Sequence, residues 1–192
     1  MSVSLDTPTT EAYVTYPEDN YKKKIEGSVT LYKGEKINVT SGGVTLSGSG
    51  AGVFHLDKGG ELKFQEDGSL ALYSSDLWVK NTSPMTINMS YAKVNIGENS
   101  TMNLSQNEVG SSVYHLAGFV EVANIAGKNT VLPKGQKITI LSKDTAKTDV
   151  DLSLLKEDID DYFKASDWFL KNGGDSVVAL VEAKTATGTT QT

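Results

Sequence analysis

The two histidines of the chain are the first candidates for chemistry. His55 lies in Gly52–Leu56 and His115 in Ser112–Leu116, each between an aromatic residue and a leucine. Two imidazoles on one face of equivalent strands could meet and bind a metal ion. A stable site needs a fuller ligand set, and no third ligand is within reach by sequence. The sequence therefore favours two structural histidines, and we expect no metal.

Carboxylates are the second candidates, because a pair of acidic side chains can hydrolyse a glycosidic bond. The candidates are Glu61, Glu66, Asp67 and Asp76. Glu66 and Asp67 precede Gly68 in a segment typical of a hairpin turn, and no group of aromatic residues surrounds them. The chain also has none of the glycine-rich or nucleophile motifs of nucleotide-binding proteins and hydrolases. We expect no enzyme and no cofactor, and keep a carbohydrate-active enzyme or lectin as a third hypothesis.

Composition excludes several further classes. The 192 residues carry a net charge of −6, and all 18 basic residues are lysines. An acidic chain without arginine is poorly suited to nucleic acid or to an anionic membrane surface. The chain has no cysteine, which excludes disulfides and thiol chemistry. It contains no apolar run long enough to span a bilayer, and its first residues do not resemble a signal peptide. We expect either a protein that is not exported or one whose export or anchor segment lies outside this sequence.

Short alternating segments must position these side chains. Between residues 112 and 141, apolar and polar residues alternate with period two, and glycine or proline separates the runs. The same pattern extends back to residue 25, and includes separate strands at 69–73 and 77–79 with a turn at 74–76. The predicted fold class is all-β: many short strands in a sandwich or a β-roll, solenoid-like stack, with one C-terminal helix and a final strand. We expect Val53, Phe119 and Ile138 in the core.

The similarity of the two histidine segments has two explanations. Both share an apolar–aromatic–His–Leu sequence followed by a glycine, Gly59 or Gly118. A duplicated structural unit is one explanation, and chance in a β-rich chain is the other.

The N-terminal residues 1–24 are rich in threonine, proline and charge, and we predict a flexible arm. Its apolar patch has a second interpretation, because such a patch could add a strand to the sheet edge of a partner. The residues of this predicted partner strand are Ala12, Tyr13, Val14, Thr15 and Tyr16.

After a predicted β domain over residues 25–149, the pattern changes. Apolar residues at 152, 155, 159, 162 and 163 predict a helix, with Asp151 or Ser153 as its N-cap. Residues 176–181 predict a closing strand, so we expect residues 150–183 to form a helix and a strand packed on the β domain. We expect a disordered tail at 184–192. The predicted structural anchors are Trp78, Trp168 and Phe169, with the last two locking the terminal helix onto the sheet.

Four segments resemble the FecR domain, a β-rich bacterial family found outside the cytoplasmic membrane. They are Gly27–Leu31 with the turn at Lys33–Glu35, Ala51–Leu62, Val113–Val122 and Val131–Gln136. The resemblance covers roughly residues 27–141. Lys58-Gly59-Gly60 departs from the Asp-Gly-Ser usual in the family, and residues 152–170 lie outside the match.

The resemblance implies an extracytoplasmic, non-catalytic domain. Family members relay ligand status from an outer-membrane receptor to a sigma factor, but this chain lacks their cytoplasmic and membrane helices, so we do not carry that signalling over. Our first hypothesis is a cell-envelope domain that binds another protein or a surface ligand. The second is a structural subunit of a surface filament or layer, which self-associates by strand addition through residues 12–16.

Overall fold

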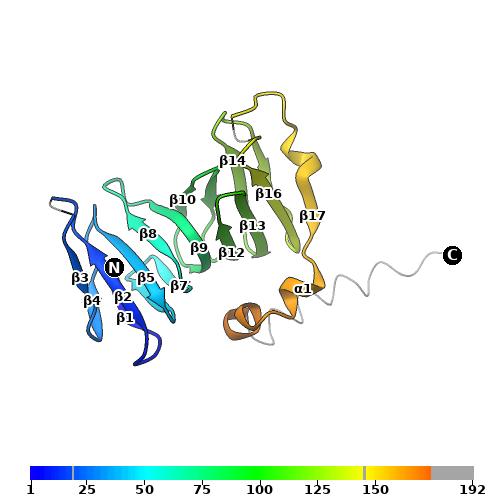
Figure 1. Ribbon diagram of the computed structural model, residues 1–192. Helices are drawn as coiled ribbons and strands as arrows, with labels where there is room; N and C mark the ends of the chain where they lie inside the picture. Colours follow the sequence, from blue (N-terminus) through cyan, green and yellow to red (C-terminus); the bar gives the residue numbers. More distant parts are fainter. Residues whose placement is uncertain (19, 145, 174–192) are drawn as a thin grey trace.

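A single long strand, β9 (Leu70–Asn81), joins two sheets into one stack (Figure 1). The computed structural model describes residues 1–18, 20–144 and 146–173. Residues 70–74 of β9 pair in one sheet, named sheet B, and residues 75–81 pair in the other, named sheet A. The strand bends between these parts, where Ser75 has a φ of 71°. The predicted turn at residues 74–76 is therefore wrong, because the chain continues as one strand that changes sheet.

Both sheets run the length of the stack. Neighbouring strands pair antiparallel throughout, except for the parallel pair β9–β10. The spatial order of sheet A is β4 (Ser28–Thr30), β1 (Ser2–Leu5), β6 (Val44–Gly48), β7 (Gly52–Leu56), β9, β12 (Thr101–Gln106), β13 (Gly110–Ala117), β16 (Gln136–Leu141) and β17 (Lys156–Asp158). The spatial order of sheet B is β3 (Lys22–Lys24), β2 (Glu11–Thr15), β5 (Lys36–Ser41), β8 (Glu61–Phe64), β9, β10 (Met85–Met89), β11 (Ala92–Ile96), β14 (Val120–Asn124) and β15 (Asn129–Val131).

From β10 onward, consecutive pairs of strands alternate between the sheets. The chain forms β10–β11 in sheet B, β12–β13 in sheet A, β14–β15 in sheet B and β16–β17 in sheet A. Each pair hydrogen-bonds to the earlier pair in its own sheet, through β11–β14 and β13–β16. The all-β prediction is confirmed, and the arrangement is a two-sheet stack built by alternation, as in a β-roll.

The main core lies between the sheets and follows from the alternation of side chains along each strand. In β9, Leu70 and Leu72 enter it from sheet B, and Leu77 and Val79 enter it from sheet A. Ile138 is buried as predicted, but Val53 and Phe119 are 38% and 49% exposed. The prediction for those two is wrong: Phe54 and Leu56 point inward in β7, which turns Val53 outward, and Phe119 lies outside the strands β13 and β14.

The prediction of a flexible arm over residues 1–24 is also wrong. Residues in this range form β1, β2 and β3, which extend both sheets toward the N-terminal end of the stack. Val3, Ala12 and Val14 are buried in the main core. These three apolar side chains are spaced so that they fill the core, although the surrounding threonine and acidic residues make the segment look polar.

The C-terminal segment does not form one continuous helix over the apolar residues at 152–163, as predicted. It forms a short 3-10 helix, η1 (Leu152–Leu155), then β17, then α1 (Asp161–Lys164), and residues 167–173 are helical. Leu152 enters the main core, whereas Ile159 joins a second cluster on the outer face of sheet A. The chain must cross the edge of sheet A between Leu152 and Ile159, and one straight helix could not place side chains on both faces of the sheet. The closing strand and the tail predicted at 176–192 lie outside the described residues.

Candidate functional site

A row of outward-facing side chains crosses sheet A from β1 to the edge strand β17. Strand register places one residue of the row on each strand from β1 to β17, each directly opposite the next. Because neighbouring side chains at such positions lie about 5 Å apart, the row forms a continuous track. We name it the cross-strand row, and its members are Ser4, Thr45, His55, Trp78, Asn103, Tyr114, Lys137 and Glu157.

The C-terminal segment packs along this row. Asp160 accepts a hydrogen bond at 2.8 Å from Lys137 Nζ, and Phe163 stacks on Tyr114 with ring centroids 4.1 Å apart. Further along, Phe169 meets the fully buried Trp78 edge-on at 5.8 Å. The segment is thus held by successive members of the row as it crosses the sheet.

The three predicted anchors meet in this interface. Trp78 and Phe169 are fully buried, and Trp168 is half-buried. The indole Nε1 of Trp168 donates a 2.7 Å hydrogen bond to Oδ1 of Asn103, which is itself fully buried. Sequence reasoning did not identify Asn103, because nothing in Thr101–Leu104 distinguishes an asparagine under a helix from one in solvent.

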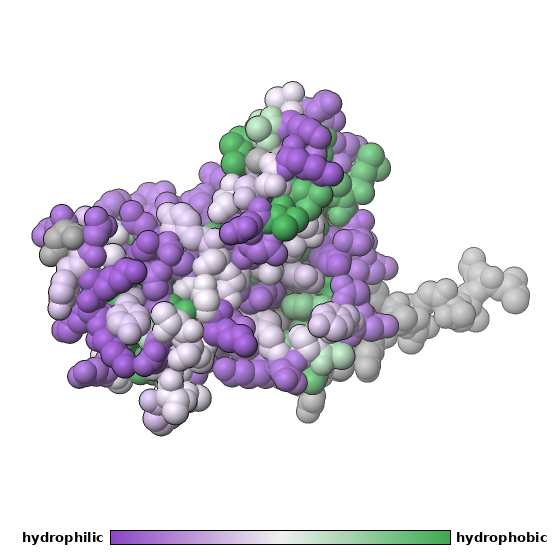
Figure 2. Space-filling view, viewed as in Figure 1, coloured by the Kyte–Doolittle hydropathy of each residue, from purple (hydrophilic) through white to green (hydrophobic). Residues whose placement is uncertain are grey.

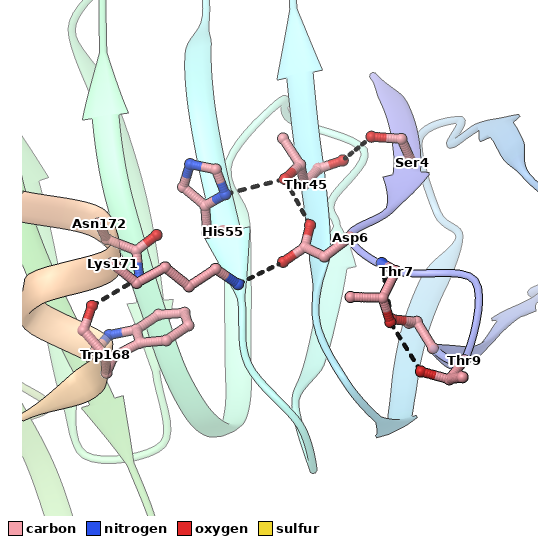
Figure 3. Close-up of polar contacts among 10 residues, drawn as sticks. Ser4, Asp6, Thr7, Thr9, Thr45, His55, Trp168, Lys171 and Asn172 are labelled. Carbon is pink, nitrogen blue, oxygen red and sulfur yellow. Dashed lines mark hydrogen bonds and ion pairs between the residues drawn. The ribbon is translucent and has the colours of Figure 1, made fainter.

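The far end of the row holds a polar network, drawn in Figure 3. Thr45 Oγ1 donates a 2.7 Å hydrogen bond to Asp6 and lies 2.9 Å from Nδ1 of His55. The second oxygen of Asp6 forms a 3.0 Å ion pair with Nζ of Lys171, which extends from the terminal helix (Figure 3). The network therefore connects β6, β7 and the residue that follows β1 to the terminal helix.

The geometry of this network does not fit nucleophilic catalysis. The threonine lies between the histidine and the aspartate, so its hydroxyl proton goes to Asp6 rather than to the imidazole, whereas a triad needs the histidine in the middle. Burial lowers the pKa of His55 from its usual value, with the Asp6 carboxylate opposing that change and Lys171 adding to it. We interpret the network as a polar attachment for the terminal helix.

His115 and His55 do not meet. They lie on β13 and β7, which β9 and β12 separate, and they point to opposite faces of sheet A. The imidazole Nδ1 of His115 lies 2.6 Å from the carbonyl oxygen of Leu132, so Nδ1 carries the proton that it donates there. Tyr114 points outward whereas the aligned Phe54 points inward, so the two similar segments are out of phase and not equivalent. Among the described residues, no group of three metal-ligating side chains is present.

The candidate carboxylates are also dispersed. Glu61 lies in sheet B and forms a 2.8 Å ion pair with Lys36. Asp67 holds the turn before β9 by accepting hydrogen bonds from the backbone and hydroxyl of Ser69, which lower its pKa. Asp76 lies on the outer face of sheet A, where burial raises its pKa although Asn103 donates to it at 3.0 Å. Glu61 lies on β8, which pairs with the sheet B part of β9, whereas Asp76 lies in the sheet A part of β9 on its outer face. The structure therefore does not bring these carboxylates together as an acid and base.

The predicted partner strand is not available for strand addition. Residues 11–15 form β2, which hydrogen-bonds to β3 on one side and to β5 on the other. Ala12 and Val14 are buried in the core, and Tyr16 stacks on Tyr21. The prediction that residues 12–16 pair with a partner is therefore wrong for this structure, because both sides of the strand are already used.

Two of the exposed large apolar side chains lie in turns on one flank of the stack. Val109 lies in the turn between β12 and β13, and Ile125 in the turn between β14 and β15. They are 65% and 64% exposed. Figure 2 shows a largely hydrophilic face with hydrophobic residues concentrated in its upper part, around β14, β16 and the segment before β17. We name Val109 and Ile125 the turn-flank residues; sequence analysis missed them because turns usually carry polar residues.

Comparison with known proteins gives a likeness of fold. No protein-family model matches the chain, and no curated protein matches it. A crystal structure from Parabacteroides distasonis, described as a "putative anti-sigma factor", aligns with a TM-score of 0.51 and 18% identity. The alignment covers 65% of this chain and 60% of that chain. A second structure with the same description and organism aligns at a TM-score of 0.46 and 17% identity, covering 69% of this chain and 59% of that one. In the described residues, no helix is both long and apolar enough to cross a bilayer.

Proposed function

We propose that the chain is a non-catalytic, FecR-like domain of the bacterial cell envelope that binds another protein. The observation that carries the proposal is the exposure of the two turn-flank residues, because large apolar side chains left in solvent on a folded domain are candidate contacts for another protein. The fold shared with a described anti-sigma factor supports a regulatory, protein-binding class. The sequence resemblance over residues 27–141 supports the family and the extracytoplasmic location.

A photo-crosslinking amino acid at position 109 tests this function. Introduced in the source organism, it should give a discrete covalent product with a second protein, recovered with the envelope fraction. The matched control is the same amino acid at position 80, because Lys80 is exposed and lies opposite Thr101, at the other end of β12 from the turn that contains Val109. A yield at position 109 no higher than at position 80 would contradict the proposal.

A second candidate function is a subunit of a filament or layer. Within the described residues, the edge strands at the two ends of the stack pair on one side only. They favour this function, because an open sheet edge is a template for another strand. Addition through residues 12–16 is not the route, for the reason given above. The ends themselves are the surfaces that such an assembly would use.

A further inference from the structure

Both ends of the stack finish in short strands that pair on one side only. At the N-terminal end these are β4 in sheet A and β3 in sheet B, and at the C-terminal end they are β17 and β15. The statement holds for the described part of the chain. Each of the four strands has three residues, so the exposed hydrogen-bonding edges are short.

The N-terminal end contains an open groove. Its volume is about 400 Å³, and its apolar lining includes Val14, Tyr16, Tyr21 and Val29. Tyr21 is 60% exposed, with its ring stacked on that of Tyr16 at 6.3 Å. The three lysines of β3 also line the groove. Lys24 pairs with Glu11, whereas Lys22 and Lys23 form no ion pair within the described residues.

The C-terminal end of the stack carries acidic side chains and a projecting apolar side chain. There η1 covers the end of the stack, and Leu152 occupies the main core. Leu154 of the same short helix points away from the core and is 81% exposed. On the adjacent edge strand, Glu157 and Asp158 are exposed. One end therefore offers an apolar groove with lysines, and the other offers a projecting leucine with carboxylates.

We propose that the chain binds a second copy of itself end to end, with the C-terminal end of one copy against the N-terminal end of the next. Leu154 enters the groove at Tyr16 and Tyr21, and the carboxylates of β17 face Lys22 and Lys23. The occupant is a second copy because the complementary apolar and charged groups lie at opposite ends of the same chain. The inference rests on the second candidate function and is independent of binding at the turn flank.

The symmetry and the small size of this interface determine the form and the strength of the association. An interface between two different ends leaves each copy with one free end of each kind. Copies therefore keep adding with the same polarity, and they form an open chain or, where the rotation between copies closes, a ring. The edges are short and the charges exposed, so the association is weak and is weakened further by salt.

Sedimentation velocity of the full chain over a range of concentrations tests the proposal. The wild-type sedimentation coefficient should rise with concentration and fall when salt is added. Two variants each disable one end: Lys22→Glu with Lys23→Glu, and Glu157→Lys with Asp158→Lys. Each alone should stay monomeric, because its two ends then carry charge of the same sign. An equimolar mixture of the two variants and the fourfold variant should both assemble again, because each N-terminal end then meets a C-terminal end of opposite charge.

Two control substitutions, Lys93→Glu and Glu108→Lys, change charge at exposed positions away from the ends and should assemble like the wild type. Far-ultraviolet circular dichroism and thermal melting establish that every variant is folded. A wild-type chain that stays monomeric at all concentrations would overturn both this inference and the filament candidate. Wild-type assembly that neither end variant reduces would overturn this inference alone and leave the filament candidate standing.

Discussion

Trp168 and Asn103 show how single side chains connect the terminal segment to the sheet. The indole donates to an amide oxygen that is fully buried, and the amide nitrogen in turn donates to Asp76. A buried polar group costs free energy when its partner is removed, so the three residues depend on one another. In contrast, Nε1 of Trp78 has no hydrogen-bond partner among the described residues, so this ring contributes through packing.

Trp168→Ala should therefore lower the free energy of unfolding by about 3 kcal/mol, because it removes a partly buried ring and the hydrogen-bond donor to Asn103. Trp168→Phe is the matched variant: it keeps most of the ring and loses only the hydrogen bond, so we expect a loss of about 1 kcal/mol. Urea denaturation measures both values. An unchanged midpoint for the alanine variant would refute the anchoring role predicted from the sequence.

Asp76 should make stability depend on pH. Burial raises its pKa in the folded state, so the folded protein binds this proton more tightly than the unfolded chain does. This contribution to stability is present at low pH and is lost as pH rises from about 4 through the raised pKa. Asp67, Asp151 and Asp160 have lowered pKa values and act with the opposite sign, so the wild-type curve alone does not isolate Asp76.

The difference in free energy of unfolding between the wild type and Asp76→Asn isolates the contribution of Asp76. We expect the wild type to lose stability relative to the variant as pH rises above about 4, with a constant difference at higher pH. Chemical denaturation at a series of pH values gives the two curves. A difference that does not change with pH would show that Asp76 has an ordinary pKa in the folded protein.

At the scale of elements, different kinds of contact hold the C-terminal segment and the strands of the sheets in place. Strands of the stack exchange backbone hydrogen bonds with neighbours on both sides, except at the four edges. Residues 159–173 contact sheet A mainly through side chains: aromatic contacts, the Asn103 hydrogen bond, and the ion pairs of Lys137 and Lys171. Contacts of this kind can be lost without disrupting the sheets.

Amide hydrogen exchange should therefore separate the two parts. We expect amides of residues 161–173 to exchange through local opening, faster than the amides of β9, β12 and β13, which should exchange only through global unfolding. Exchange monitored by mass spectrometry at peptide resolution suffices. Equal protection in both regions would mean that the terminal segment belongs to the same cooperative unit as the stack.

The elements also show where sequence reasoning succeeds. Alternation with glycine punctuation predicted the strands around β7, β13 and β16, because one face of each strand must enter the core. It failed at β9, where Ser74, Ser75 and Asp76 look like a turn although the strand continues into the other sheet. It failed for the predicted helix too, because periodicity does not reveal that Leu152 and Ile159 pack on opposite faces of sheet A.

The candidate site was less predictable than the fold. Trp78, Trp168 and Phe169 were identified because large aromatic side chains are usually buried. The cross-strand row depends on the register of eight strands, which local sequence does not specify. Thr45, Asp6 and Lys171 come together from three distant segments, and no spacing in the chain relates them.

At the scale of the whole molecule, the stack has one continuous core and two unlike ends. The core passes from one end to the other because β9 contributes Leu70 and Leu72 to sheet B, and Leu77 and Val79 to sheet A. The terminal segment covers the part of the outer face of sheet A around Trp78 and Tyr114, while the turn flank and the ends remain exposed. Binding surfaces at these exposed regions are what we propose for function.

The crossing of β9 between the sheets is the feature on which the architecture depends, and nuclear Overhauser effects between backbone protons test it most directly. The account predicts contacts of Leu72 with Leu62 in sheet B and of Val79 with Phe54 in sheet A, within one folded chain. Contacts that instead pair residues 69–73 with residues 77–79, as a hairpin turning at 74–76 requires, would contradict it.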